Sequence, residues 1–438
     1  MPAATSPERP RTGITRLTGG RLVKGNALVE EDLWISSVTG KILHSQEVFY
    51  SHQVVPDEII DLEGKILAPG MIDVQFNGAF GYDFSTIPDD MSEYIKGLKR
   101  LNRKLVRTGV TSYLPTIPSN KPEVYHQALP HLGPSGNGRD PHEGSESLGA
   151  HCEGPFISPT KNGCHGQDVL KAAPNGFADL ESCYGAKNLA SEGNEKRSPI
   201  TMITAAPEVE GVASTIREVE KRGIIFSVGH TEATFEQAGE AIQNGATMIT
   251  HLFNAMRPLH HRNPGIFGVL GKVEGSERRP YFGIIADGIH LHPTTVKLAW
   301  NAHPDGFILV TDAMKTVGQP DGVYDWTNGD RFVKKGSLLT LEGTDTIAGS
   351  CASLIECVSN FWSWSHAPLP DVINAVTATP ARMLGLEKTK GTLTAGADAD
   401  LLVLNPREES DGRRVLDVHQ VWKFGVLVSD AKDDEYGA

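Results

Sequence analysis

Two short apolar runs in the middle of the chain each lead to a histidine. Residues Ile224–Val228 precede His230, and residues Ala246–Ile249 precede His251. The segment between them, Thr234–Asn244, has apolar residues at helical spacing, so the pattern predicts a strand, a helix and a second strand. Parallel barrel strands open their carboxyl ends on one face, which would bring both histidines to one pocket. Taken singly, either histidine is more commonly an ordinary hydrogen-bonded core residue.

The alternation of strand-length apolar runs and helical segments continues on both sides of this unit. The predicted strands are Met71–Val74, Gly109–Thr116, Leu148–Cys152, Ile200–Ala206, Ile224–Val228, Ala246–Ile249, Tyr281–Ala286 and Gly306–Val310. Helical spacing is found at Met91–Thr108, Pro122–Leu132 and Gly211–Arg222 between them, and at Ala352–Trp364 and Leu369–Ala378 after them. About eight strands, most followed by a helix, predict an α/β fold of the (β/α)8 TIM-like barrel type.

Both ends of the chain have short strand-like segments separated by turn signals. Residues 15–67 and 391–430, with strands expected at Gly391–Leu404 and Val418–Val428, predict the two parts of a small β-sandwich domain. The barrel, residues 68–390, would be inserted between them. Residues 1–14 are polar and Pro-rich, so we expect a disordered tail and not a secretory signal. Two polar segments, residues 133–149 and 181–198, are predicted as loops.

Composition narrows the class of protein. The 438 residues carry a formal net charge of −13 and are 39% hydrophobic, which fits a globular enzyme. This charge argues against nucleic acid or an anionic membrane as partner, although a small anionic substrate remains compatible with local positive charge. The five cysteines lack CxxC spacing, so we expect no disulfide framework and a reducing, cytoplasmic location. No apolar run reaches the roughly 18 to 20 residues of a membrane helix.

Polar residues close most of the predicted barrel strands. They are Gln75, Asn77, Glu153, His230, His251, His290 and Asp312. Glu153, His230 and His251 would offer three ligands and leave one coordination position open for water, as in catalytic zinc sites. Asp312 would stand beside that water as general base, because a metal lowers the pKa of bound water and a carboxylate can take its proton.

Each of these residues has a simpler interpretation when it is taken alone. Asp312 could be a helix cap or a turn residue, and Glu153 could be a solvated carboxylate in a Gly-Pro turn. Three ligands and a base that all follow strands of one barrel favour the metal site when they are considered together.

Several sequence motifs carry a resemblance to a known family. They are APGMIDVQFNG, HCEGPF, KNGCHG, SVGHTEA, THLFNAM, NPGIFG, DGIHL, LVTDAM and ATPARMLGLEKTKGTLTAGADADLLVL. These resemble the amidohydrolase superfamily, and within it the family of N-acetylglucosamine-6-phosphate deacetylases. The resemblance extends from about Thr15 to Val428. HCEGPF, HLFNAM and DGIH make it specific, because most other amidohydrolases do not share them.

The resemblance implies one metal ion per subunit. The superfamily commonly has His-x-His at the end of the first barrel strand for a second metal, whereas this chain has Gln75-Phe76-Asn77. Neutral amides are poor zinc ligands, so we expect one divalent ion, Zn²⁺, held by Glu153, His230 and His251. The ligand set by itself leaves iron, manganese and cobalt open, as well as a weak second metal.

The resemblance also implies roles for residues around the metal. His165 would contact and polarise the acetamide carbonyl, and Gln75 would lie near the metal and the substrate. The residues that would hold the sugar phosphate are Asn254 and Ala255, through the backbone, and Arg262 and His290, through their side chains. In the family this arginine can come from the neighbouring subunit, so a homodimer is implied. Taken alone, these residues could be a surface arginine and loop histidines.

The reaction implied is hydrolysis of the acetamide of N-acetyl-D-glucosamine 6-phosphate to glucosamine 6-phosphate and acetate. Asp312 would deprotonate the metal-bound water and then protonate the leaving amine, while the metal and His165 stabilise the oxyanion. Two alternatives remain: a related amidohydrolase acting on another amide, dihydropyrimidinase-like or aminoacylase-like, and a non-catalytic structural relative.

Overall fold

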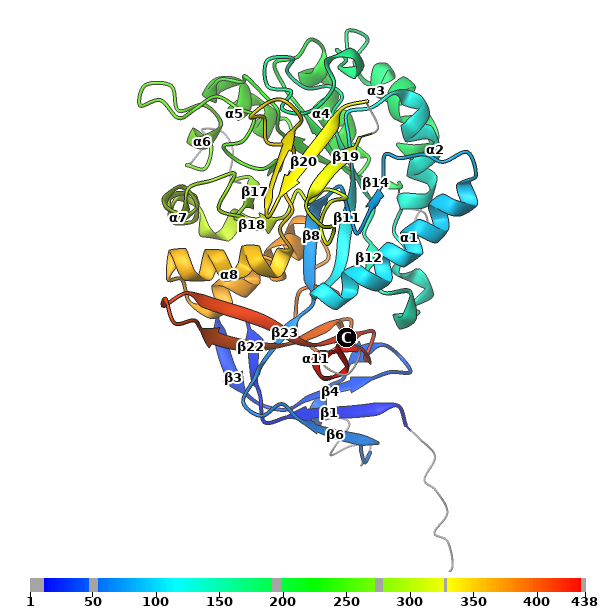
Figure 1. Ribbon diagram of the computed structural model, residues 1–438, viewed down its shortest axis with the longest axis vertical. Coiled ribbons are helices and arrows are strands. Elements are labelled where there is room, and N and C mark those ends of the chain that lie inside the picture. The colour runs from blue at the N-terminus through cyan, green and yellow to red at the C-terminus, as the bar shows by residue number, and fades with distance from the viewer. Residues whose placement is uncertain (1–11, 47–53, 191–197, 272–278, 327–328, 435–438) are drawn as a thin grey trace, which may run out of the picture.

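Eight parallel strands form a barrel in a computed structural model of the protein, which describes residues 12–46, 54–190, 198–271, 279–326 and 329–434 (Figure 1). They are β8 (Met71–Phe76), β11 (Val110–Pro118), β13 (Ala150–Glu153), β14 (Ile200–Ala205), β15 (Ile225–Val228), β16 (Met248–Ile249), β17 (Tyr281–Ile285) and β18 (Phe307–Val310). From β8 to β18 each strand pairs with the next barrel strand along the chain. The predicted (β/α)8 barrel is therefore confirmed.

The barrel closes between its last strand and its first. The backbone amide of Asp312, just beyond β18, donates to the carbonyl of Gln75 at 2.9 Å. The hydroxyl of the preceding residue, Thr311, donates to the carboxylate of Asp73 at 2.6 Å. Asp73 is buried, and burial raises its pKa to about 7. Closure places Gln75 of the first strand beside Asp312 of the last, so it also assembles part of the rim.

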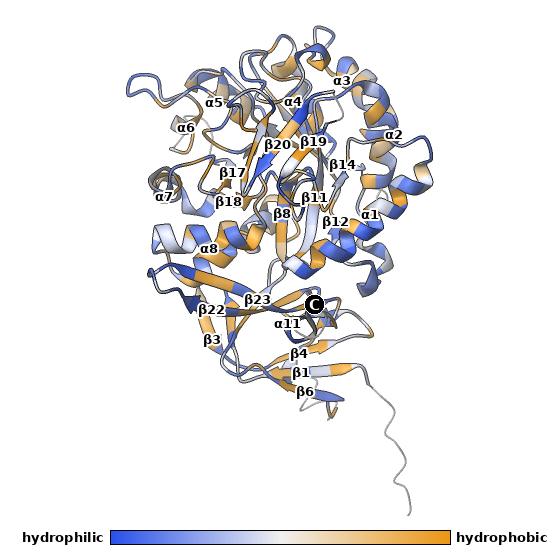
Figure 2. Cartoon of the chain, viewed as in Figure 1, coloured by the Kyte–Doolittle hydropathy of each residue, from blue (hydrophilic) through white to orange (hydrophobic). Residues whose placement is uncertain are grey.

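Helices surround the barrel where the apolar spacing predicts them. α1 (Met91–Leu105) begins at Asp90, whose side chain accepts the Ser92 amide at 2.8 Å, and α5 (Phe235–Gln243) begins with a capping box at Thr234. The others are α2 (Pro122–Leu132), α3 (Phe177–Tyr184), α4 (Ile216–Lys221), α6 (Gly265–Gly268), α7 (Pro293–Ala302), α8 (Leu354–Ser365), α9 (Leu369–Asn374) and α10 (Ala378–Met383). Figure 2 shows hydrophobic residues along β8 and β17 and mixed hydropathy on α1. No helix among the described residues combines the length and apolarity needed to cross a membrane.

Strands from both ends of the chain form a β-sandwich at one end of the barrel (Figure 1). One sheet contains β1 (Ile14–Thr18), β4 (Leu33–Ser36), β5 (Lys41–Ile42) and β6 (Glu58–Asp61). The other contains β2 (Arg21–Lys24), β3 (Ala27–Glu30), β7 (Ile66–Pro69), β22 (Leu401–Glu408), β23 (Arg414–Lys423) and β24 (Val426–Asp430). Leu17, Ile35, Leu67, Val403 and Trp422 pack in the core of this domain. The predicted insertion of the barrel into a β-domain built from both termini is confirmed.

The exact limits of the parts remain a proposal, namely residues 15–67 and 391–430 for the β-domain and 68–390 for the barrel. Strand β7 crosses the first of these limits. Residues 1–11 of the predicted tail lie outside the described residues, and Ile14 already pairs with Ser36 in β1. Residues 191–197 of the second predicted loop also lie outside the described residues.

A buried group of charges joins the β-sandwich to the barrel. Lys423, at the end of β23, is 0% exposed and donates to Glu146 Oε1 at 2.7 Å and Asp400 Oδ2 at 2.8 Å. Lys390 contacts the same two carboxylates and also Asp398. Burial alone raises the pKa of Asp400, but the two lysines more than offset this and hold that pKa well below its usual range. Asp400 is therefore ionised and is paired with two buried lysines.

This charge cluster explains two differences from the predictions. The predicted surface loop at residues 133–149 contains β12 (Glu146–Ser147), which pairs with β11 and carries the buried Glu146. The strand predicted at Gly391–Leu404 begins only at Leu401, because the residues before it instead bring Asp398 and Asp400 to Lys390. Glu146 looks like a solvated loop residue in sequence, since its two lysine partners lie 244 and 277 positions away along the chain.

Other segments also differ from the predicted elements. Glu181, the start of the second predicted loop, lies inside α3. The helix predicted at Leu369–Ala378 ends at Asn374, as α9, and α10 begins at Ala378. An antiparallel sheet of β19 (Gly322–Asp325), β20 (Arg331–Lys335) and β21 (Leu338–Leu341) follows β18 and was not predicted. Its Phe332 and Leu339 pack with Met314 and Trp326. This small sheet thus has its own apolar core.

Replacing Lys423 by methionine should destabilise the protein by about 3–5 kcal/mol, because buried carboxylates lose a paired cation. The measurement is the midpoint of urea unfolding. Lys96→Met is the matched control, since Lys96 forms an exposed pair with Glu93 at 2.8 Å, and exposed pairs contribute little. Equal midpoints for the two variants would contradict the stabilising role of the buried cluster.

Candidate active site

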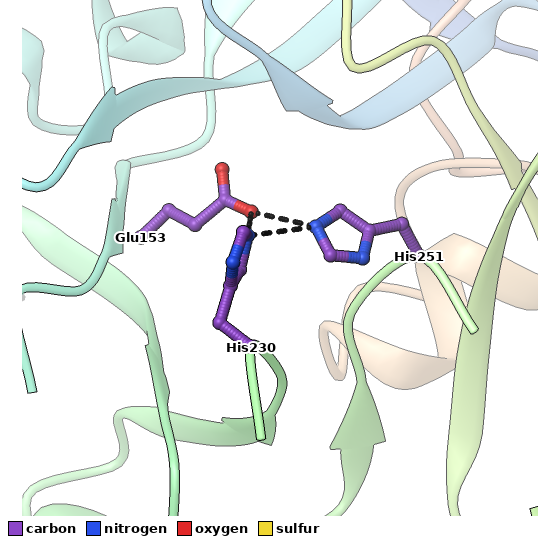
Figure 3. A group of neighbouring side chains, drawn as sticks. All are labelled: Glu153, His230 and His251. Carbon is purple, nitrogen blue, oxygen red and sulfur yellow. Dashed lines mark hydrogen bonds and ion pairs between the residues drawn. The ribbon is translucent and has the colours of Figure 1, made fainter. Parts of the chain in front are cut away.

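Three side chains from three barrel strands meet at the carboxyl end of the barrel (Figure 3). Glu153 Oε1 lies 3.2 Å from His230 Nε2 and 3.0 Å from His251 Nε2, and the two nitrogens are 3.1 Å apart. All three residues are buried. Figure 3 shows the carboxylate and both rings directed toward one another from separate segments of the chain. The structure therefore brings together the three ligands that the sequence predicts.

The backbone at the strand ends directs these side chains. His230 has a φ of 48° and His251 a φ of 26°, and Asp312 follows its own strand with a φ of 49°. Residues with a Cβ rarely adopt such left-handed conformations, which cluster at functional sites. Gly229, immediately before His230, leaves no room for a Cβ, because that atom would lie 2.7 Å from Thr250 Cβ. The turns that direct these side chains into the pocket therefore have a strained backbone and close packing.

The donor set fits a divalent cation. His230 Nδ1 lies 2.7 Å from the carbonyl of Lys161, to which it can only donate, so Nε2 presents its lone pair to the group. Burial alone raises the pKa of Glu153, but its close contacts with the imidazoles of His230 and His251 lower it well below its ordinary value. One ionised carboxylate and two imidazoles are ligands that zinc and similar ions prefer, and they leave a coordination position open.

Asp312 lies beside this set and is held by two amides of the first strand. Asn77 Nδ2 donates to Asp312 Oδ1 at 2.7 Å, and Gln75 Nε2 donates to the same oxygen at 3.2 Å. Gln75 Nε2 also donates to Glu153 Oε1 at 2.9 Å. Burial and the nearby Glu153 carboxylate raise the pKa of Asp312 to about 6. A carboxyl group with a pKa close to neutral can both accept and return a proton.

His165 is neutral and offers a hydrogen-bond donor. Its Nδ1 accepts the backbone N–H of Ser119 at 3.2 Å and lies 2.7 Å from the Ser119 hydroxyl. Burial, followed by the nearby His230, lowers the pKa of His165 to about 3. The single ring proton is therefore on Nε2. A neutral N–H donor in the pocket lining can polarise a carbonyl group without adding charge.

Comparison with known proteins agrees with this geometry. Residues 66–428 match the amidohydrolase family. The chain belongs to this family. It is 42% identical over 399 residues to an N-acetylglucosamine-6-phosphate deacetylase from Danio rerio, covering 90% of this chain and 93% of that protein. It is 40% identical to the protein of the same name from Homo sapiens over 399 residues, covering 90% and 92% of the two chains.

Solved structures extend the similarity of this amidohydrolase to three dimensions. The crystal structure of N-acetylglucosamine-6-phosphate deacetylase from Pasteurella multocida matches with a TM-score of 0.76 at 26% sequence identity. The match covers 94% of this chain and 99% of that chain. Similarity over nearly the whole length includes both the barrel and the β-sandwich.

The pocket of this amidohydrolase is completed by loops that follow the strands. Its volume is about 680 Å³ including the space at its open mouth, and Asn254, Ala255 and His290 line it together with the ligand set. His290 Nδ1 lies 2.7 Å from Asp287 Oδ2. Three of the residues predicted to hold a phosphate therefore lie on the wall of the pocket that contains Glu153, His230 and His251.

Two residues predicted to bind substrate lie off this wall. Gln75 is 2% exposed and contacts Glu153 and Asp312 instead of the open space. Arg262 is exposed, and its Nη1 lies 3.0 Å from His261 Nε2. Within one chain, the described residues that line the pocket do not include Arg262. The substrate-binding roles of both residues remain predictions.

Several residues of the site were not predicted from the sequence. The additional residues that line the pocket are Pro118, Gly163, Cys164, Ile285, Met314, Trp326, Ile347 and Gly349. Ser119 carried a usable signal, since it is a polar residue directly after β11, as Glu153 closes β13. Asp287 carried one too, since it ends the predicted strand before His290. Trp326 had no such signal, because it belongs to the insertion that follows β18.

Replacing Glu153 by glutamine should lower the metal content of the purified protein about tenfold or more, because the set loses its anionic ligand. Elemental analysis after dialysis gives the measurement. Asp312→Asn is the matched control, since it neutralises a carboxylate of the same pocket that is not in the ligand set. Loss of metal from Asp312→Asn as well, or full retention by Glu153→Gln, would show that the ligands are assigned wrongly.

Proposed function

We propose that the protein hydrolyses the acetamide of N-acetyl-D-glucosamine 6-phosphate, releasing acetate and glucosamine 6-phosphate. The observation that carries the proposal is Asp312, a carboxylate of raised pKa, beside the converging Glu153, His230 and His251 in a barrel pocket. The extensive identity to deacetylases of this name supports the choice of substrate. The same identity argues against the alternatives of another amide substrate or a non-catalytic relative.

Glu153, His230 and His251 would hold one divalent ion per subunit, for which we propose Zn²⁺. Such an ion supplies Lewis acidity, which makes a water molecule more acidic and a carbonyl carbon more electrophilic. The neutral amides of Gln75 and Asn77 would not favour a second ion, because both donate N–H groups to carboxylates.

Asp312 moves the proton in this reaction. Its ionised carboxylate accepts a proton from the water that attacks the acetamide carbon. The protonated Asp312 then gives this proton to the amide nitrogen as the C–N bond breaks, so the base returns to its starting state. Asn77 and Gln75 hold one carboxylate oxygen during both transfers, since both donate to Oδ1.

His165 would stabilise the oxygen of the acetamide. Because its Nδ1 accepts the Ser119 amide, its Nε2–H is free to donate to the carbonyl oxygen and then to the oxyanion that replaces it. Its low pKa keeps the ring neutral, so the ring does not compete with the carboxylates for a proton.

The phosphate end of the substrate would bind at the part of the pocket wall formed by Asn254, Ala255 and His290. The backbone N–H of Ala255 and the side chain of His290 would serve there, whereas the backbone N–H of Asn254 donates to the carbonyl of His251 at 3.0 Å. Arg262 lies off this wall in its own chain, which supports the proposal that the protein acts as a homodimer with this arginine reaching the neighbouring site. The described cysteines are all free, which supports a reducing, cytoplasmic location.

The proposal is tested by measuring acetate release from N-acetylglucosamine 6-phosphate. We expect turnover by the metal-loaded protein, and its loss on chelation and recovery on addition of Zn²⁺. Asp312→Asn should lower kcat by roughly 10²–10⁴-fold with metal retained, because the general base is removed. Comparable turnover of unphosphorylated N-acetylglucosamine would contradict the substrate assignment, and an active Asp312→Asn variant would contradict the base.

The pH dependence follows from the raised pKa of Asp312. Only its ionised form accepts a proton, so kcat/KM should fall as pH drops through this pKa, by about tenfold per pH unit. The midpoint should lie at or below about pH 6, because a bound cation favours the ionised carboxylate and can only lower the pKa. Initial rates over the acid range give the profile, with circular dichroism to confirm folding. A kcat/KM that stays constant or rises through this range would exclude Asp312 as the base.

A further inference from the structure

We propose that Asp287 is a positioning residue that fixes the ring of His290 through Nδ1, so that Nε2 is directed at the phosphate group of the substrate. The inference rests on the proposed function, since it concerns the phosphorylated end of the same substrate. It assigns a role to a buried carboxylate that neither the metal site nor the proton transfer uses.

The geometry joins the two side chains closely. Asp287 Oδ2 lies 2.7 Å from His290 Nδ1, and Asp287 Oδ1 accepts the backbone N–H groups of Ile289 and His290, each at 2.9 Å. The side chain of Asp287 is 1% exposed and that of His290 is 8% exposed. One carboxylate thus fixes both the turn after β17 and the ring that the turn carries.

The charges of the pocket leave His290 as the residue suited to an anion. Glu153 and Asp312 are acidic, and a phosphate would need a compensating positive group some distance from them. Among the imidazoles on the described wall, His230 and His251 belong to the ligand set, and His165 is kept neutral. His290 is the imidazole there that is paired with a buried carboxylate of its own.

The pairing with Asp287 determines which nitrogen of His290 would bind a phosphate. Asp287 accepts the proton on Nδ1, so Nε2 is the nitrogen left for the pocket. Burial alone raises the pKa of Asp287, but His290 and two backbone amides lower it below its ordinary value, so the carboxylate is ionised. With Asp287 at Nδ1 and a phosphate oxygen at Nε2, the ring would lie between two anions, and each of its nitrogens would donate a charge-assisted hydrogen bond to one of them.

The substitution Asp287→Asn removes the charge of the carboxylate and keeps the structure of the turn. The asparagine Oδ1 can still accept the backbone N–H groups of Ile289 and His290, so the turn is kept. Its Nδ2 would donate to His290 Nδ1, which forces the ring into the neutral form with the proton on Nε2. The ring keeps its position and a donor at Nε2, but its Nδ1 no longer faces an anion.

The test compares KM and kcat for N-acetylglucosamine 6-phosphate in the metal-loaded wild-type protein, Asp287→Asn, His290→Ala and the double variant. We expect Asp287→Asn to raise KM about tenfold and to leave kcat within about twofold, because charge-assisted bonds are roughly twice as strong as neutral ones. In the His290→Ala background the same substitution should change KM little, since the carboxylate acts through the ring. Asp90→Asn is the matched control, since Asp90 accepts the Ser92 amide in a similar turn with no histidine.

Three results would overturn the inference. These are an unchanged KM in Asp287→Asn, a loss confined to kcat, and an equal loss in the His290→Ala background. If Asp287→Asn does not fold, Asp287→Ser keeps an acceptor for the turn and serves for the same comparison. Failure of the wild-type protein to release acetate would instead refute the proposed function, so the two failures can be told apart.

Discussion

The convergence of one carboxylate and two imidazoles within 3.2 Å is the constraint on which the rest of the site depends. Glu153, His230 and His251 come from three strands, and each strand must end at the same height of a closed barrel for their tips to meet. Closure between Asp312 and Gln75 completes that ring. The left-handed backbone at both histidines is the local cost of turning the side chains inward at this point.

Two neutral amides adapt the site to its carboxylates. Gln75 and Asn77 donate N–H groups to Glu153, which is buried, and to the nearby Asp312, which is half-buried. Hydrogen-bond donors lower the free-energy cost of burying these negative charges. Histidines at the two positions would instead be ligands for a second cation. The amides therefore suit the proposed site, in which Glu153 would hold the metal and Asp312 would exchange protons. Their presence at the end of β8 is consistent with one metal ion.

The β-sandwich is attached to the barrel by charge as well as by apolar contact. Lys423 and Lys390 lie between the carboxylates of Glu146 and Asp400, which come from distant parts of the chain. This arrangement also explains why residues 133–149 resemble a surface loop in sequence. A buried glutamate looks like a solvated one until the lysines that neutralise it are located, and those are contributed by segments more than 200 positions away.

The sequence by itself determined the barrel strands, the β-domain from both termini and the set of Glu153, His230, His251 and Asp312. Apolar periodicity and a polar residue at a strand end are local patterns, and a parallel barrel converts them directly into a shared rim. Only the tertiary structure decided what touches these residues: the carbonyl that orients His230, the turn that pairs Asp287 with His290, and the small sheet of β19, β20 and β21 that brings Trp326 to the pocket. Such contacts depend on how loops pack across the barrel mouth, and no periodicity along the chain encodes that packing.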